Sequence, residues 1–170
     1  MIRFWAVTRI RGDLSNSADI WEKISIAEAA KHFSYPLLRP QDSKFTFVKS
    51  FGVVLKDENH RVKPGDIWFY GIYDIFQWKQ SEIVVMQTLN EVMTNVLKDP
   101  EQTMAMHYTD GKWENVEISD DVVAMFLPGS IDNYLEVNYN TADLNVIRLN
   151  LHGNASKNDL VKLAKTYLGK

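Results

Sequence analysis

One acidic side chain, Asp74, stands in the middle of an unusually aromatic stretch that reads DIWFYGIYDIFQW over residues 66–78. A carboxyl group held among aromatic rings is a candidate for acid–base chemistry. If the stretch is a strand, side chains two positions apart share one face. On the face of Asp74 the candidate ligand-binding residues are Trp68, Tyr70, Asp74, Phe76 and Trp78. Such a face could form an aromatic platform or cleft for a hydrophobic or sugar-like ligand.

The same stretch has a simpler interpretation as the central strand of a sheet. Ile67, Phe69, Tyr73 and Ile75 would occupy the opposite face, so that both faces are apolar, as in a strand covered on both sides. Aromatic residues are common in sheets. Under this interpretation the rings pack the core, and Asp74 lies at a strand kink or edge.

Motifs that carry other kinds of catalysis are missing from the sequence. The chain has no cysteine, no GxSxG serine motif and no glycine-rich phosphate loop. Its four histidines, His32, His60, His107 and His152, show no metal-binding spacing such as HExxH. We therefore predict no catalytic residue, no metal site and no cofactor. A cytosolic enzyme that combines Asp74 with His107 or His152 is an alternative hypothesis.

Charge and hydropathy argue against two kinds of partner. The chain has 170 residues with 19 basic and 22 acidic side chains and a net charge of −3. It has no basic stripe, so nucleic acid is not an expected partner. No run of about 18 apolar residues could span a membrane, and residues 1–11 are too interrupted by charge for a signal peptide. A membrane anchor is therefore expected only in a segment upstream of this chain.

The first clear element is a helix over about 25–33. Ser25 and Glu28 form a capping box, in which the serine accepts from a free N–H and the glutamate reaches back to the cap. Apolar residues then follow at helical spacing. Pro36 predicts the end of the helix, because the residue before a proline is disfavoured in the α region.

Segments typical of β-strands fill the middle of the chain. In the first, at 44–55, a face interrupted by Lys49 is expected to carry Phe45, Phe47, Phe51, Val53 and Leu55. Further strands are expected at 66–78, 81–89, 103–109, 112–118, 121–127, 133–139 and 144–151, with a short helical turn at 91–98. The pair Asp110-Gly111 predicts a two-residue hairpin turn.

The last quarter of the chain completes an α+β plan. Gly153 ends the last strand, Ser156 caps an amphipathic helix, and this helix ends at Leu168. Because the strands follow one another through short turns, they should pair antiparallel. We predict one strongly twisted, mainly antiparallel sheet with an N-terminal and a C-terminal helix packed on one face. Residues 22–170 would form this domain, and residues 1–21 a lead or stalk remnant.

Three segments resemble a known family. They are residues 24–36, with the opening helix and its proline exit, the strand IVVMQT at 83–88, and the closing unit at 146–168. Together they resemble the domain of unknown function 4367, an exported domain of Firmicute lipoproteins and anti-sigma-factor-like membrane proteins. The chain departs from the family at QDSK, residues 41–44, and at KTY, residues 165–167. The family supplies no catalytic residues.

The resemblance implies an extracytoplasmic, cell-envelope domain of a Gram-positive bacterium that binds or senses without catalysis. Its partner would be a protein or a small hydrophobic ligand. Two alternatives stay open at this point. One is a carrier that holds a lipid beneath the aromatic strand at 66–78, and the other is the cytosolic enzyme described above.

Overall fold

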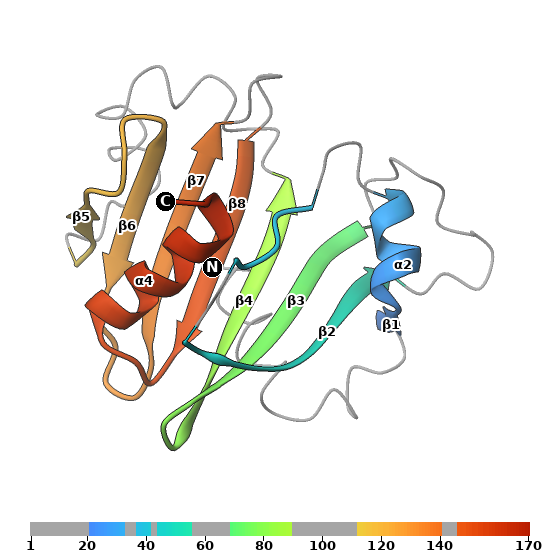
Figure 1. Cartoon of the computed structure of the whole chain (residues 1–170), viewed down its shortest axis with the longest axis horizontal. Helices are drawn as coiled ribbons and strands as arrows, with labels where there is room; N and C mark the ends of the chain where they lie inside the picture. The colour runs from blue at the N-terminus through green and yellow to red at the C-terminus, as the bar shows by residue number, and fades with distance from the viewer. Residues whose placement is uncertain (1–20, 33–36, 42–43, 56–68, 90–111, 141–145) are drawn as a thin grey trace.

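The computed structural model describes residues 21–32, 37–41, 44–55, 69–89, 112–140 and 146–170 (Figure 1). Its strands are β1 (Trp21–Ile24), β2 (Thr46–Leu55), β3 (Phe69–Trp78), β4 (Ser81–Leu89), β5 (Glu114–Val116), β6 (Val122–Leu127), β7 (Asn133–Asn140) and β8 (Val146–Gly153). Its helices are α2 (Ile26–Ala29), which continues as the 3₁₀ turn η1 (Ala30–His32), and α4 (Lys157–Leu168).

The described strands form one antiparallel sheet, in the order β1-β2-β3-β4-β8-β7-β6-β5. Both helices pack on the same face of this twisted sheet, as Figure 1 shows. We name this surface the helix face and the opposite one the far face. The predicted α+β fold, with one antiparallel sheet and a helix from each end of the domain, is confirmed.

The main hydrophobic core lies on the helix face, between α4 and the adjacent strands β3, β4, β8, β7 and β6. Four residues of α4 are buried in it, namely Leu160, Leu163, Ala164 and Tyr167. Beneath them lie alternate residues of the strands, including Phe76, Ile83, Val85, Leu135, Val137, Leu149 and Leu151. The predicted alternation in β7 is confirmed, since Leu135 and Val137 are buried and Tyr139 packs against the same core.

A second, smaller cluster lies on the far face of β2, β3 and β4. It consists of Val53, Tyr73, Ile75, Val84 and Met86, with Phe51 packed against it. The expectation that β3 is apolar on both faces is therefore confirmed for its described side chains. A strand buried on both sides tolerates little change in the volume of its side chains.

A β-bulge in β2 corrects one prediction. Phe47 pairs with Phe76 of β3, but Lys49 pairs with the next residue along, Ile75, which leaves Val48 as an extra residue. The bulge reverses the alternation. Phe45 and Phe47 therefore belong to the helix face, whereas Phe51 and Val53 belong to the far face. The single face predicted for these side chains was wrong, because strict period-two counting does not include an inserted residue.

The N-terminal helix is short and sits directly on β2. The predicted cap is confirmed, because the Ser25 hydroxyl accepts a 3.1 Å hydrogen bond from the backbone N–H of Glu28. Gly52 makes the close approach possible: a Cβ there would lie 2.5 Å from the Cβ of Ala29. Gly52 pairs with Ile72 in β3, which places α2 on the helix face.

The closing unit forms as predicted. The Ser156 hydroxyl accepts from the N–H of Asp159 at 3.2 Å and caps α4. Gly153 ends β8 where the chain passes close to β4, since a Cβ at this position would lie 2.5 Å from the carbonyl oxygen of Glu82. Gly169 follows α4 with a left-handed backbone (φ 67°), the usual way to end a helix.

Several predicted features lie outside the described residues. They are the strand at 103–109, the helical turn at 91–98, the Asp110-Gly111 hairpin turn, Pro36, and nearly all of the lead at 1–21.

Candidate functional site

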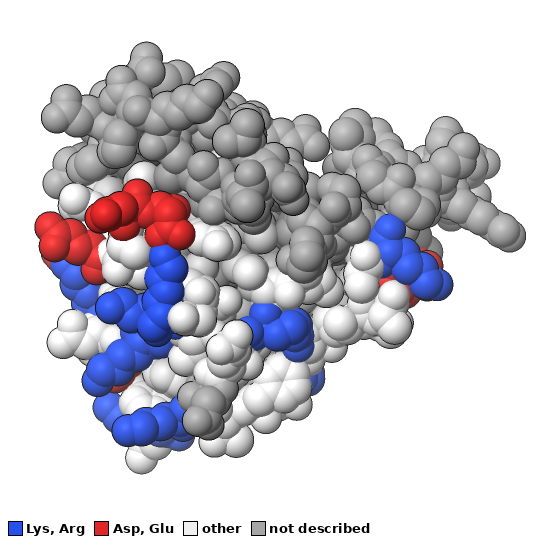
Figure 2. Space-filling view, turned by 45° about the horizontal axis from the view of Figure 1, so that its top comes forward, with Lys and Arg blue, Asp and Glu red and all other residues white. Residues whose placement is uncertain are grey.

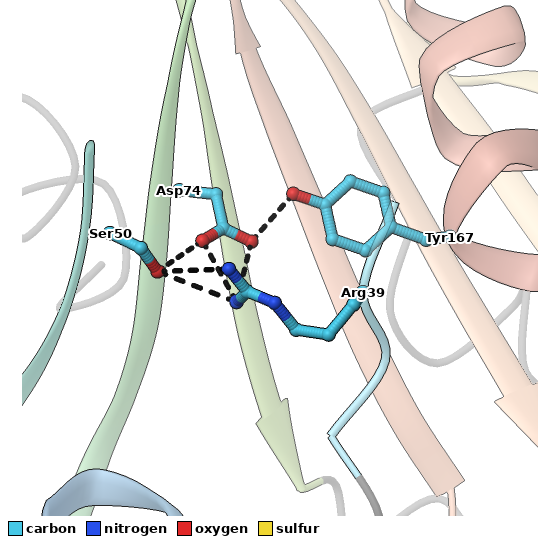
Figure 3. A network of polar contacts seen from close by, with 4 residues as sticks. All are labelled: Arg39, Ser50, Asp74 and Tyr167. Carbon is cyan, nitrogen blue, oxygen red and sulfur yellow. Dashed lines mark hydrogen bonds and ion pairs between the residues drawn. The ribbon is translucent and has the colours of Figure 1, made fainter. Parts of the chain in front are cut away.

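The carboxylate of Asp74 is the centre of a polar network on the helix face (Figure 3). The Arg39 guanidinium donates to both of its oxygens, at 3.1 and 3.3 Å. The Tyr167 hydroxyl donates to one oxygen at 2.7 Å, and the Ser50 hydroxyl donates a short hydrogen bond to the other. Each carboxylate oxygen therefore has at least two donors.

Four separate parts of the chain supply these groups. Ser50 of β2 lies directly opposite Asp74 of β3 in the ladder, so sheet register alone brings the two together. Tyr167 comes from the last turn of α4. Arg39 comes from residues 37–41, which we call the strap, an extended segment that Figure 1 shows crossing the helix face in front of β4.

The strap is itself fastened to α4. The backbone N–H of Gln41 donates to the carbonyl oxygen of Thr166 at 2.9 Å. Leu38 packs against the main core. The Arg39 ion pair, the Gln41 hydrogen bond and the packing of Leu38 thus hold the strap across the sheet.

The two partners of the Arg39–Asp74 ion pair differ in their exposure to solvent. The Asp74 side chain is only 3% exposed, whereas that of Arg39 is 40% exposed. Burial raises the pKa of the Tyr167 phenol far above its usual value, and the negative charge of Asp74 raises it further. Tyr167 therefore remains a neutral hydrogen-bond donor throughout the physiological pH range.

The network gives Asp74 a structural role. Its hydrogen-bonding capacity is occupied by three side chains that tie the strap, β2 and α4 to the middle of the sheet. A buried carboxylate is favourable only when it is paired and hydrogen-bonded, and here both conditions are met. An acid–base catalyst, in contrast, needs a lone pair or proton directed at a substrate.

Phe76 and Trp78 of β3 pack on the same face as Asp74, as the alternation predicts, whereas Tyr73 lies on the far face. Phe76 is buried, with its ring centroid 6.3 Å from that of Tyr167. Trp78 is partly buried, and its ring lies 4.4 Å from that of Phe45. Trp68 and the side chain of Tyr70 lie outside the described residues.

The structure separates Asp74 from His152. His152 pairs with Val84 of β4, on the far face, whereas Asp74 pairs with Val85. The His152 ring stacks on Tyr134 with centroids 4.2 Å apart, and its Nε2 lies 3.2 Å from a carboxylate oxygen of Asp132.

The remaining histidines add no site to the described part of the chain. His60 and His107 lie outside it, as does the side chain of His32. Within the described ranges, no group of three or more histidine, aspartate or glutamate side chains could hold a metal ion.

A second polar network lies on the far face between β7 and β8. Arg148 contacts the carboxylate of Glu136 and the amide oxygen of Asn138, each at 3.4 Å. The Asn138 amide donates to Glu136 at 3.2 Å, and Asn138 itself is fully buried. Since these groups satisfy one another across paired strands, we assign the network to cross-strand stabilisation.

Sequence reasoning found Asp74 but missed its three partners. Ser50 follows the bulge, so its position opposite Asp74 depends on a register that simple counting gives wrongly. Arg39 lies in a segment without regular structure, and Tyr167 is 93 residues from Asp74. The one available signal was Tyr167 on the buried side of a helix, because a buried phenol needs a hydrogen-bond partner.

No protein-family model, curated protein or solved structure matches this chain. None of the described helices is long and apolar enough to cross a membrane. The fold and the geometry of the helix face are therefore the features that bear on function.

Proposed function

We propose that this chain is a non-catalytic binding or sensing domain, held outside the cytoplasm by a membrane-anchored or lipoprotein parent. The resemblance to the domain of unknown function 4367 supplies the expected location. The geometry around Asp74 supports the absence of catalysis.

One observation carries the proposal. The single acidic group in the candidate site is engaged by Arg39, Ser50 and Tyr167, from three other parts of the chain. The side chains that could take part in catalysis instead hold the strap and α4 against the sheet. A rigid scaffold of this kind suits a domain that presents a surface to a partner.

Ring contacts favour this function over the lipid carrier. Beneath and beside α4, Phe45 packs on Trp78, and Phe76 contacts both Phe47, at 5.7 Å between centroids, and Tyr167. Phe45, Phe76, Trp78 and Tyr167 pack on one another where a carrier would leave room for an acyl chain. The candidate ligand-binding residues Phe76 and Trp78 thus act as core.

Location is tested on the whole gene product in its native cell. We expect it in the membrane fraction and expect added protease to degrade it in intact cells. A cytosolic, protease-resistant product would overturn the extracytoplasmic part of the proposal.

The catalytic question is tested with Asp74→Asn at the chromosomal gene. If Asp74 only holds the fold, the phenotype should follow the amount of folded protein and should be restored by raising expression. A null phenotype with normal amounts of folded protein would instead show that the carboxylate acts on a substrate.

A further inference from the structure

The outward side of α4 is basic. Leu160, Leu163 and Tyr167 point into the core, so the helical period turns Lys162 and Lys165 toward solvent. Lys162 is exposed and Lys165 is half-buried. Figure 2 shows basic side chains spread over this part of the molecule, whereas most of the acidic side chains in view gather at one edge.

Other cations extend this basic surface on both sides of α4. Arg39 is 40% exposed on the strap. Lys79, in the turn between β3 and β4, is exposed and lies over the Trp78 ring at 5.3 Å. Lys157, at the start of α4, bonds Glu114 at 2.9 Å and lies over the Phe126 ring.

Two acidic groups near α4 are held by neighbouring side chains. Asp159 has a lowered pKa because the Ser156 hydroxyl hydrogen-bonds to it, and Lys79 and Lys162 add favourable charge. Asp121 is bound by Lys170 and Ser119. These carboxylates offset part of the basic charge. The side chains named on this surface are six cations (Arg39, Lys79, Lys157, Lys162, Lys165 and Lys170) and four carboxylates (Asp74, Glu114, Asp121 and Asp159), so positive charge is in excess in a chain whose net charge is −3.

Two large apolar side chains are exposed beside the basic surface. Phe47 is 49% exposed and Val48 is 48% exposed. They stand at the β2 bulge, where Val48 is the inserted residue. The Phe47 ring contacts Phe76, which in turn contacts Tyr167 of α4, so Phe47 lies on the same face as the helix, and Val48 follows it in the chain.

We propose that this face docks on an anionic lipid surface. Lys162, Lys165 and their basic neighbours would contact phosphate headgroups, and Phe47 and Val48 would enter the boundary between headgroups and acyl chains. Cations next to exposed apolar side chains are the pattern of interfacial membrane binding, in which charge attraction and apolar burial add. An acidic protein would use the charges but would not require the exposed apolar pair. The inference rests on the proposed function only in placing the domain near a membrane.

The test uses the purified chain and extruded vesicles in a co-sedimentation assay. One set contains equal parts of phosphatidylglycerol and phosphatidylcholine, and the other contains phosphatidylcholine alone. We expect binding to the first set only, and we expect it to weaken when NaCl is raised from about 0.05 to 0.5 M, because salt screens the charges.

Two double variants separate the contributions. Lys162→Glu with Lys165→Glu should weaken binding by about 25-fold or more, since each lysine contributes about fivefold. Phe47→Ser with Val48→Ser should weaken it by about tenfold. The matched control is Lys23→Glu with Lys31→Glu, the same charge change at exposed positions on β1 and η1 away from α4. Thermal unfolding of each variant verifies the fold.

Three results would overturn the inference. The first is equal or absent binding to the two vesicle sets. The second is equal weakening by the control and by the α4 variant. The third is unchanged binding by the Phe47–Val48 variant, which would point to an acidic protein partner. Because the assay uses purified protein, its failure is distinguishable from a failure of the location experiment.

Discussion

The hydroxyl of Tyr167 donates a 2.7 Å hydrogen bond to the carboxylate of Asp74, and the two residues are 93 positions apart in the sequence. One belongs to the last turn of the last helix and the other to the middle of β3. This contact joins the end of the chain to the centre of the sheet. It also supplies Asp74 with a neutral donor that complements the charged donor Arg39.

Replacing Tyr167 by phenylalanine should lower the free energy of unfolding by about 1–3 kcal/mol, the cost of leaving a buried polar group one partner short. The ring stays, so packing against Phe76 is retained. Urea unfolding at pH 7 followed by fluorescence measures the change. An unchanged free energy of unfolding would mean that water or another group donates to Asp74 in place of the Tyr167 hydroxyl.

The same contact predicts a pH dependence at the alkaline end. Burial and the Asp74 charge raise the pKa of Tyr167, whereas an unfolded tyrosine ionises near pH 10. The folded state therefore holds more protons above about pH 10, so the contribution of Tyr167 is complete below that pH and decreases as pH rises further. The stability difference between the parent and Tyr167→Phe should narrow between about pH 10 and 11. If the free energies of unfolding of the parent and of Tyr167→Phe instead change in parallel with pH, the raised pKa of Tyr167 is contradicted.

The ion pair between Arg39 and Asp74 should show a coupling energy of about 1–2 kcal/mol in a double-mutant cycle with Arg39→Met and Asp74→Asn. A fully buried pair would give more, but Arg39 is 40% exposed and solvent screens its charge. The matched control is the Glu28–Lys31 pair, whose side chains are 47% and 65% exposed. Its cycle should give less than about 0.5 kcal/mol. Equal couplings in the two cycles would contradict a structural role for the Asp74 network.

Local signals in the sequence predict most of this fold. β4 has the predicted bounds, and the caps at Ser25 and Ser156 are found where the motifs place them. These features depend on residues within a few positions of one another, where periodicity and capping chemistry decide the outcome.

Features that depend on distant contacts were not predictable in this way. The bulge at Val48 follows from how β2 fits β3, and it changes the face of every later residue in the strand. The partners of Asp74 come from a strap, a strand and a helix that only the tertiary structure brings together. The sequence therefore indicates a carboxylate of interest without indicating its role.

Close packing between α2 and β2 predicts that Gly52→Ala is destabilising. The added methyl group would lie 2.5 Å from the Cβ of Ala29 and 2.9 Å from Cγ1 of Ile24. Overpacking of this kind costs about 1–3 kcal/mol, to be measured by urea unfolding. The second-site change Ala29→Gly should recover part of the loss in the double variant, beyond its own effect in the parent. Additive losses would show that the clash is not with Ala29.

Gln87 is the clearest place where a polar side chain costs stability. It is 2% exposed, and neither the nitrogen nor the oxygen of its side-chain amide has a hydrogen-bond partner among the residues that the structure describes. It pairs with Ile72 and with Leu149, so its neighbours in the ladder are apolar. Gln87→Leu keeps a similar volume and removes the unsatisfied groups, so it should raise the free energy of unfolding by about 1–2 kcal/mol.

The control for this change is Gln77→Leu in β3. The Gln77 amide donates to the carbonyl oxygens of Lys79 and Ser81, both at 3.0 Å, and so fastens the β3–β4 turn. Its replacement should lower the free energy of unfolding by about 1–2 kcal/mol. The same substitution should thus have opposite signs at the two positions in urea titrations. If Gln87→Leu also destabilises, the Gln87 amide has a partner in the folded protein, and the buried surface around β4 is more polar than its ladder neighbours indicate.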